Sequence, residues 1–225
     1  PEQIANFCLK NNIKAIAYTY NEPTIFVEYA LDVMKLAKKN NIKNIFVSNG
    51  FMSNETIELI KHYLDAINID LKSFTNDFYK KICFANIKPI KTNIKKFYDL
   101  HIWQEITTLI IPGFNDSDDE LEKIANFIYN ISSDIPWHIS AFYPAYKMLN
   151  IMSTPMNTLQ KAYTIGKKAG LKYIYVGNIN NDYDDTVCAN CQNILVKRSG
   201  FVVEENNIVN NKCPKCQTLI AGIWN

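Results

Sequence analysis

The sequence predicts an α/β fold with a parallel sheet, followed by a small cysteine-rich module. Strand-like and helix-like segments alternate almost from end to end, which implies parallel strands joined by right-handed crossovers. About six strands are too few for a closed eight-stranded barrel, so a partial barrel or an open doubly wound sheet fits residues 1–180. Beyond Thr186 the pattern changes to short strands and C-x-x-C turns, and we expect a second module over residues 186–225.

The expected strands are short, mostly apolar runs that stop at polar residues or at a Pro-Gly pair. In the first of them Tyr18 and Tyr20 share one face, and we expect both tyrosines to pack in the core. The strands are expected over residues 13–20, 44–48, 66–72, 103–111, 137–142 and 173–176.

The expected helices are recognised by apolar stripes and by residues that cap their ends. Ser53 and Thr92 can each accept a hydrogen bond from the first N–H groups of a helix. Residues 117–120 read Ser-Asp-Asp-Glu, which is a capping box. We expect helices over residues 24–40, after Ser53, near 76–81, from Thr92 to Leu100, after Ser117 and from Pro155 to Gly170.

Composition and charge narrow the class of protein. The 225 residues carry a net charge of +2, which argues against a broad nucleic-acid surface. No apolar run is long enough to span a bilayer and no signal peptide is visible, so we expect a cytoplasmic protein without a membrane partner. The chain begins at Pro1, in what reads as the first turn of a helix, and we expect an N-terminal segment to precede it.

Polar side chains follow four of the expected strands, where ligands of α/β folds bind. The first strand runs into Asn21, Glu22 and a proline that ends it. The face of another strand repeats polar residues at every second position, although a parallel sheet covered by helices should be apolar on both faces. We expect these residues to line a site for a polar small molecule: Asn21, Glu22, Ser48, Asn49, Asn68, Asp70, Lys72, His138 and Ser140.

Several of these residues also have a purely structural interpretation. Asp70 and Lys72 can form an ion pair at a strand end, and His138 can be a hydrogen-bonded core residue. Glu22 is either part of a polar loop or a carboxylate that receives a ligand ammonium group. Glu105 on another strand is costly to bury without a partner, and Lys72 is a candidate for that partner.

The strongest local signal is a pair of C-x-x-C turns. Cys188, Cys191, Cys213 and Cys216 offer four thiolates that can close tetrahedrally on zinc, as in a zinc ribbon, and rubredoxin-like iron is the alternative. Because sulfur fills every position, the site is expected to be structural. The residues between the turns have hairpin character, and so small a module depends on its metal to fold. The two other cysteines, Cys8 and Cys83, are expected to be buried small hydrophobes.

Several long motifs together resemble the radical SAM enzyme of the AmmeMemoRadiSam system. That family is related to the activating enzymes of glycyl-radical enzymes such as pyruvate formate-lyase, and the resemblance runs from Pro1 to the end of the chain. The motifs, in order, are YTYNEP, FVSNGFMS, DAINIDLKSF, EITTLIIPGFNDSDDEL, PWHISAFYPAYKM, AGLKYIYVGN, the two C-x-x-C pairs and a final GIW.

The resemblance implies a partial (β/α)6 barrel that binds S-adenosylmethionine (SAM) and a [4Fe–4S] cluster. Asn21 and Glu22 stand where related enzymes have Gly-Gly-Glu-Pro, which meets the amino group of SAM. Ser48 and Asn49 match a Thr-Asn-Gly of the activating enzymes. The remaining matches are Asp70 and Lys72, near the SAM ribose and carboxylate, and His138, close to SAM.

Two departures from the family pattern matter. Val47 stands where glycyl-radical activators carry Asp, so a side-chain ligand is lost there. The cluster motif C-x-x-x-C-x-x-C, whose three thiolates leave the fourth iron for SAM, matches none of the six cysteines. We expect that motif in the segment upstream of Pro1, and the chain alone should not make a radical.

The resemblance implies reductive cleavage of SAM to methionine and a 5′-deoxyadenosyl radical, which removes hydrogen from a substrate. The substrate is not encoded in these motifs and can be another protein; the electron donor would be a flavodoxin or ferredoxin. Two other functions remain open. One is a non-enzymatic zinc-ribbon binding module on an α/β scaffold, and the other is a lyase that uses Lys72 as a Schiff base.

Overall fold

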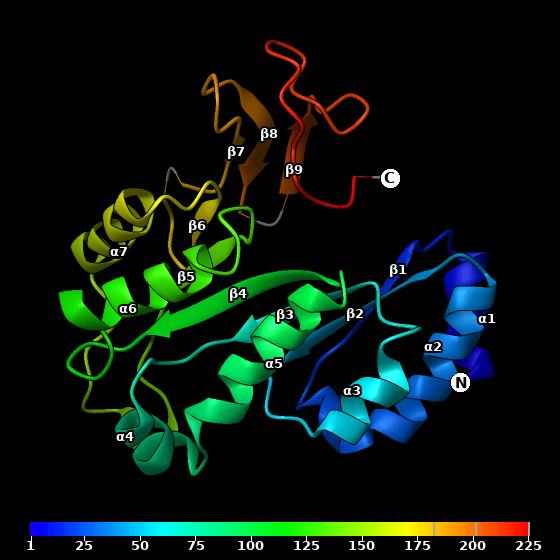
Figure 1. Cartoon of the computed structure of the whole chain (residues 1–225), viewed down its shortest axis with the longest axis horizontal. Helices are drawn as coiled ribbons and strands as arrows, with labels where there is room; N and C mark the ends of the chain where they lie inside the picture. The colour runs from blue at the N-terminus through cyan, green and yellow to red at the C-terminus, as the bar shows by residue number, and fades with distance from the viewer. Residues whose placement is uncertain (182, 201, 225) are drawn as a thin grey trace. The chain divides into compact units, whose positions relative to one another are not determined.

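The computed structural model describes residues 1–181, 183–200 and 202–224. Its main sheet has six strands that neighbour one another in sequence order (Figure 1). All pairs with a defined register, β1–β2, β2–β3, β4–β5 and β5–β6, are parallel. The strands are β1 Ala15–Tyr18, β2 Lys43–Ser48, β3 Ala66–Asp70, β4 Trp103–Ile110, β5 Trp137–Ala141 and β6 Ile174–Gly177.

The strand order distinguishes the two predicted architectures. A doubly wound sheet reverses its strand order at a switch point, whereas a barrel-type sheet adds each strand beside the previous one. The order β1 to β6 has no reversal. The predicted partial-barrel type of α/β fold, with six parallel strands, is therefore confirmed.

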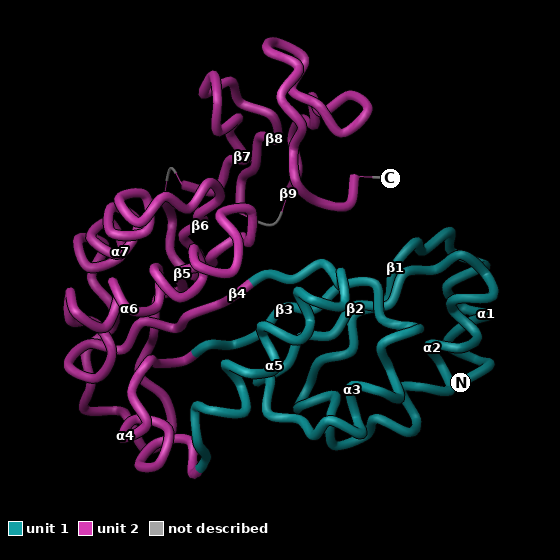
Figure 2. Tube along the Cα trace, viewed as in Figure 1, with its two compact units in different colours: residues 1–71, 85–105 teal, residues 72–84, 106–225 magenta. Residues whose placement is uncertain are grey.

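The chain divides into two compact units, coloured separately in Figure 2. The first unit comprises residues 1–71 and 85–105, and the second comprises residues 72–84 and 106–225. Each unit is described by itself below.

In the first unit, helices carry one apolar face toward the strands. Helix α2 shows the pattern most clearly, since Ala30, Val33 and Ala37 recur at helical spacing and are fully buried. Helix α1 lies beside α2 (Figure 1). The elements of this unit outside the sheet are α1 Glu2–Lys10, the 3₁₀ turn η1 Pro23–Phe26, α2 Val27–Lys39, α3 Asn54–Ile60 and α5 Ile87–Asp99.

Two helix starts test the capping predictions. The Ser53 side chain accepts a hydrogen bond from the N–H of Thr56 at 3.2 Å, so the predicted cap of α3 is confirmed. The predicted start at Thr92 is wrong, because α5 begins at Ile87. Pro89 falls in the first turn of α5, where its missing N–H has no intrahelical partner to lose, so it does not delay the helix.

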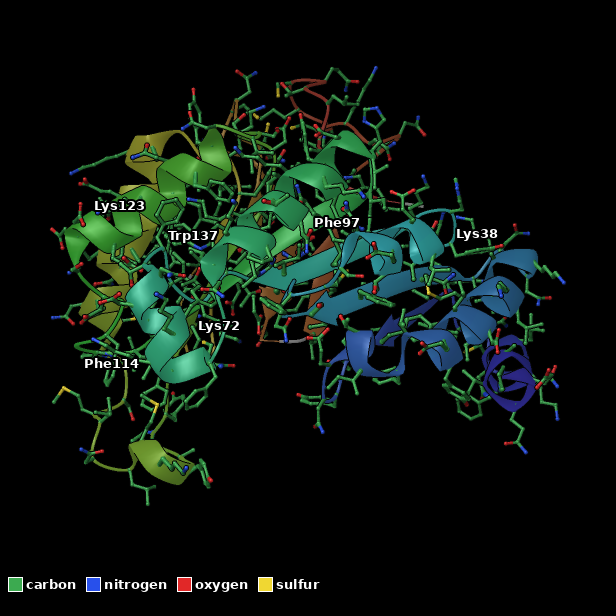
Figure 3. The ribbon with its side chains drawn as sticks, turned by 60° about the horizontal axis from the view of Figure 1, so that its bottom comes forward. Lys38, Lys72, Phe97, Phe114, Lys123 and Trp137 are labelled. Carbon is green, nitrogen blue, oxygen red and sulfur yellow. The ribbon has the colours of Figure 1, made fainter. Side chains whose placement is uncertain are left out.

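In the second unit, α6 and α7 lie side by side (Figure 1). Trp137 (labelled in Figure 3) is fully buried, and its indole N–H donates to the Thr108 hydroxyl at 2.9 Å. Gly166 lets α7 approach closely, since a Cβ there would lie 2.6 Å from the Ile174 side chain. Gly170 ends α7 at φ 98°, as predicted. The elements are α4 Asn76–Phe78, the π turn η2 Tyr79–Cys83, α6 Asp118–Tyr129, the 3₁₀ turn η3 Tyr146–Met148 and α7 Met156–Ala169.

Two strands end earlier than expected, and this changes the position of two side chains. Because β1 stops at Tyr18, the next tyrosine, Tyr20, is 90% exposed, and its predicted core packing is wrong. Tyr18 is buried, and its hydroxyl donates to Oδ1 of Asn44 at 2.9 Å. Strand β3 stops at Asp70, so Lys72 follows the strand rather than belonging to it.

The C-terminal residues form a separate three-stranded antiparallel sheet with the order β7-β8-β9. Its strands are β7 Thr186–Val187, β8 Ile194–Ser199 and β9 Val202–Asn206, which confirms the predicted hairpin. The apolar cluster of this module also contains Tyr173, and Tyr175 of β6 packs against it. The module is thus built onto the last strand of the main sheet, and the domain boundary near residue 186 stays a prediction.

No helix among the described residues is long and apolar enough to cross a membrane.

One buried polar side chain leads to a stability prediction. Gln104 on β4 is 2% exposed, and its amide nitrogen and oxygen find no hydrogen-bond partner among the described residues. A buried amide without partners costs about 1–3 kcal/mol. We expect Gln104→Leu to raise the free energy of unfolding by about 1 kcal/mol, measured by urea denaturation. Exposed Gln160→Leu is the matched control, and a lower midpoint for Gln104→Leu would contradict the expectation.

Candidate functional site

Glu22 joins the ends of β1 and β2 in the first unit. Its Oε1 accepts hydrogen bonds from the N–H and the hydroxyl of Thr24, at 3.1 and 2.7 Å, and from the hydroxyl of Ser48 at 2.7 Å. Its Oε2 accepts from the backbone N–H of Asn49 at 2.7 Å. The carboxylate therefore caps η1 and at the same time holds the chain that leaves β2. Three of the predicted site residues, Glu22, Ser48 and Asn49, are brought together by these bonds.

The turn after β2 depends on a glycine. Gly50 has φ 72°, and a Cβ at this position would lie 2.7 Å from the Ile69 side chain. The Gly50 N–H donates to the Ser48 hydroxyl at 3.0 Å, which fixes one side of the turn. Asn93 on α5 fixes the other side, since its Nδ2 donates to the carbonyl oxygens of Gly50 and Met52, both at 2.9 Å.

Asn93 was missed in the sequence because a single asparagine in a helix has no characteristic pattern. It is 5% exposed, and the other inward positions of α5 are apolar. A buried amide on the apolar face of an amphipathic helix is the signal that could have found it. Its two hydrogen bonds to carbonyl oxygens satisfy both amide hydrogens.

Two other predicted site residues belong to the first unit. Asp70 is the last residue of β3, and it alternates with the buried Ile69 as the strand prediction required. Asn21 lies in the exposed segment between β1 and η1. Glu105 on β4 accepts a hydrogen bond from the indole N–H of Trp103 at 3.1 Å.

In the second unit, the backbone of Lys72 is held on both sides. Its N–H donates to the hydroxyl of Tyr79 at 3.0 Å, and its carbonyl oxygen accepts from Nδ2 of Asn115 at 2.7 Å. Asn115 is almost fully buried, and its Oδ1 accepts from the N–H of Ile111 at 2.6 Å. Lys72, which is marked in Figure 3, is fixed at its main chain by these contacts.

Glu120 extends this support to the next two residues. Its Oε1 accepts hydrogen bonds from the Ser73 hydroxyl and from the Phe74 N–H, and Glu120 is 4% exposed. The sequence predicted Glu120 only as half of a capping box. The Ser117 hydroxyl does accept from the Glu120 N–H at 3.3 Å, but the carboxylate serves the loop after β3. Tertiary contacts decide this use, and nothing in the local motif distinguishes it.

His138 lies on β5, half-buried, and stacks on Tyr175 of β6 with ring centroids 5.1 Å apart at 25°. Ser140 follows on the same face, also half-buried. Trp137, before His138, and Ile139, between His138 and Ser140, are fully buried, so the predicted alternation on this strand is confirmed.

The four cysteines of the C-terminal module form a compact cluster. Their sulfur atoms all lie within 4.8 Å of one another. The sulfur atoms of Cys188 and Cys216 lie 3.5 Å apart and those of Cys191 and Cys213 lie 3.6 Å apart, which is too far for disulfides. Four thiolates around a tetrahedral zinc lie about 3.8 Å from one another. The cluster therefore fits a single four-coordinate metal ion.

The two C-x-x-C turns have the same backbone geometry. In each, the glutamine after the second cysteine has a left-handed conformation, with φ 58° at Gln192 and φ 59° at Gln217. Each glutamine N–H donates at 2.9 Å to the carbonyl oxygen of the first cysteine of its turn. The hydroxyl and the backbone N–H of Thr218 lower the pKa of the Cys216 thiol, whereas burial and the neighbouring sulfur atoms raise the pKa of Cys191.

The lone cysteines differ from each other. Cys8 is buried in a small apolar cluster with Ala37 and Ile42, as predicted. Cys83 is only half-buried at the end of η2, so its predicted burial is only partly correct; burial raises the pKa of its thiol.

Comparisons with known proteins give the family. The model of the radical SAM superfamily matches residues 1–128. An uncharacterized protein of Methanocaldococcus jannaschii is 35% identical over 96% of this chain and 65% of its own length. The pyruvate formate-lyase-activating enzyme of Clostridium pasteurianum is 25% identical over 60% of this chain and 58% of its own length. The structure of Streptococcus suis SuiB bound to S-adenosylmethionine shares the fold, with a TM-score of 0.65, 11% identity and coverage of 79% of this chain and 42% of SuiB.

This chain thus spans less than two thirds of the length of the two sequence relatives. None of these comparisons tests the resemblance to the AmmeMemoRadiSam system, which stays a prediction. The superfamily model covers more than half of the chain, and the M. jannaschii relative matches nearly all of it. The chain belongs to the radical SAM superfamily and is related to the pyruvate formate-lyase-activating enzymes.

Proposed function

We propose that this chain is the SAM-binding part of an enzyme that reductively cleaves SAM and uses the 5′-deoxyadenosyl radical to remove hydrogen from a substrate. The observation that carries the proposal is the Glu22 carboxylate, hydrogen-bonded to Ser48 and Asn49 at the carboxyl ends of two parallel strands. Ligands of α/β folds bind at these ends. Membership in the radical SAM superfamily supplies the chemistry that such a site serves.

In this proposal, different residues bind different chemical groups of SAM. In our proposal Asn21 and Glu22 receive its ammonium group. Oε2 of Glu22 accepts the Asn49 N–H, and a carboxylate oxygen can accept a second donor. The Asn49 Oδ1 accepts the Phe51 N–H at 2.7 Å, which leaves its amide hydrogens to meet the ligand.

Asp70, Lys72 and His138 complete the proposed SAM site. Asp70 would accept hydrogen bonds from the ribose hydroxyls, and Lys72 would pair with the SAM carboxylate. His138 would pack near the nucleoside. The contacts that hold the Lys72 main chain in the second unit would fix the position from which its side chain reaches the ligand.

The superfamily implies an iron–sulfur cluster beside SAM. When bound, the cluster supplies the electron that breaks the C5′–S bond of SAM. The four clustered cysteines fit one mononuclear ion, and the sequence has no C-x-x-x-C-x-x-C motif. We therefore propose that the cluster ligands lie outside residues 1–225, that a flavodoxin or ferredoxin donates the electron, and that the substrate is another protein, as the name of the C. pasteurianum relative suggests.

The test is reductive cleavage of SAM by the complete protein, including any residues before Pro1, reconstituted with iron and sulfide without oxygen and supplied with a reduced flavodoxin or a chemical reductant. We expect 5′-deoxyadenosine and methionine in equal amounts. Changing Glu22, Asp70 and His138 together to Ala should lower the yield on the order of 100-fold, because misplacing a bound reactant has this scale of effect. Exposed Glu28→Ala is the control. Unchanged turnover in the triple variant would refute the site, and no cleavage by the wild type would refute the function.

A further inference from the structure

Tyr175 connects the candidate site to the C-terminal module within the second unit. It lies on β6, next to β5, and its register partner across the sheet is His138. The two rings are stacked at 5.1 Å between centroids and 25° between planes. The imidazole therefore rests on the tyrosine ring, and the orientation of one ring depends on that of the other.

The C-terminal module contacts both the hydroxyl and the ring of Tyr175. Its hydroxyl and the hydroxyl of Thr186 on β7 lie 2.9 Å apart. The guanidinium of Arg198 on β8 stands over the tyrosine ring, with its carbon 5.6 Å from the centroid. Arg198 also donates to the Thr186 hydroxyl at 2.8 Å and to the carbonyl oxygen of Asp184 at 3.0 Å. Together these contacts connect the Tyr175 ring to Thr186 on β7 and to Arg198 on β8.

The strands that carry Thr186 and Arg198 are also packed against the cysteine cluster. The backbone N–H of Arg198 donates to Oδ1 of Asp185 at 2.7 Å, which places β8 against β7. Leu195 and Val196, three and two residues before Arg198, are buried in one apolar cluster with Cys188 and Cys213, and Tyr175 packs against that cluster. A metal ion held by the four cysteines would thus stabilise the strands that carry Arg198 and Thr186.

We infer that the C-terminal module is a positioning device for His138, acting through Arg198 and Tyr175. The terminal torsion of a histidine side chain has broad, roughly two-fold preferences, so a neighbour must select the plane of the imidazole. The stacked tyrosine ring provides that neighbour. The guanidinium and the Thr186 hydroxyl keep the ring in place. Only the consequence for SAM rests on the proposed function, since the contacts themselves do not depend on it.

The test uses the zinc-loaded chain with isotope-labelled histidine, observed by NMR. The chain has three histidines. His62 and His101 are exposed and serve as internal references, while His138→Gln assigns the third signal. In the wild type we expect the His138 ring protons to be displaced by the current of the stacked tyrosine ring. Tyr175→Leu should return them toward the exposed references, whereas Tyr175→Phe keeps the ring and should leave them in place.

Arg198→Gln tests the link to the module without removing a core residue, because Arg198 is only half-buried. Retained zinc and an unchanged circular dichroism spectrum show that this variant is folded. We expect its His138 signals to shift in the same direction as in Tyr175→Leu, and chelation of the zinc should shift them likewise.

His138 signals that stay at their wild-type positions in Arg198→Gln and after zinc removal would overturn the inference. Equal shifts in Tyr175→Phe and Tyr175→Leu would overturn it too. A complete protein that fails to cleave SAM would refute the proposed function but leave these signals unchanged, so the two failures can be told apart.

Discussion

Replacing Glu22 with glutamine is expected to destabilise the first unit and to weaken the proposed SAM site at the same time. Each carboxylate oxygen of Glu22 accepts at least one backbone N–H, from Thr24 on Oε1 and from Asn49 on Oε2. Glutamine has the same shape but replaces one oxygen by an NH₂ group. Whichever way the amide is turned, its NH₂ group faces a backbone N–H, so at least one hydrogen bond is lost and two donors are opposed.

We expect Glu22→Gln to lower the free energy of unfolding of the chain by about 2 kcal/mol, the scale of a hydrogen bond to a charged group. Urea denaturation of the chain gives the stability, and calorimetric titration of SAM into the complete reconstituted protein gives the affinity. Glu28→Gln, on the exposed side of α2, is the matched control and should change neither. An unfolding midpoint for Glu22→Gln equal to that of the control would show that the network around Glu22 contributes no stability.

The second large effect is expected from Cys213→Ser. Cys213 is fully buried in the C-terminal module, and its sulfur lies 3.6 Å from that of Cys191. Structural zinc contributes on the order of 10 kcal/mol to the folding of small zinc modules. Apart from the cysteines, the apolar cluster of this module is small. Loss of one thiolate should therefore release the metal and unfold β7, β8 and β9.

Elemental analysis of the purified chain is expected to find one zinc or iron ion in the wild type and almost none in Cys213→Ser. Hydrogen exchange should lose protection over residues 186–224, while the first unit keeps it. Cys83→Ser, outside the cluster and half-buried, should retain both metal and protection. Full metal content in Cys213→Ser would rule out this cysteine as a ligand, and protection that survives without metal would rule out metal-dependent folding.

Much of the fold could be predicted from the sequence because its signals are local. The apolar stripe of α2 and the cap at Ser53 depend on residues a few positions apart. The start of α5 could not be predicted in this way. Thr92 was predicted to cap this helix, yet the helix already begins at Ile87. Pro89 is tolerated in its first turn, and the burial of Ile87 and Ile90 decides where the helix begins.

The candidate site likewise has features that local sequence patterns predict and contacts that they do not. Alternation along β5 was sufficient to predict that His138 and Ser140 share a face, since side chains of a strand point alternately to its two sides. The partners of these side chains could not be predicted, because they come from other elements. The stack of His138 on Tyr175 joins residues 37 positions apart in the 225-residue chain, and no spacing rule reaches that far.

The sequence by itself determined the α/β class, the polar strand ends and the metal-binding cysteine pattern, because periodicity, caps and C-x-x-C spacing act within a few residues. Only the tertiary structure decided that Glu22 connects the ends of β1 and β2 and that the Glu120 carboxylate accepts hydrogen bonds from the loop after β3. It also decided that the Arg198 guanidinium lies over the Tyr175 ring. A carboxylate can accept a hydrogen bond from any donor that packing brings near it, and a guanidinium can lie over any nearby aromatic ring. Which donor or ring is near depends on the packing of the whole fold.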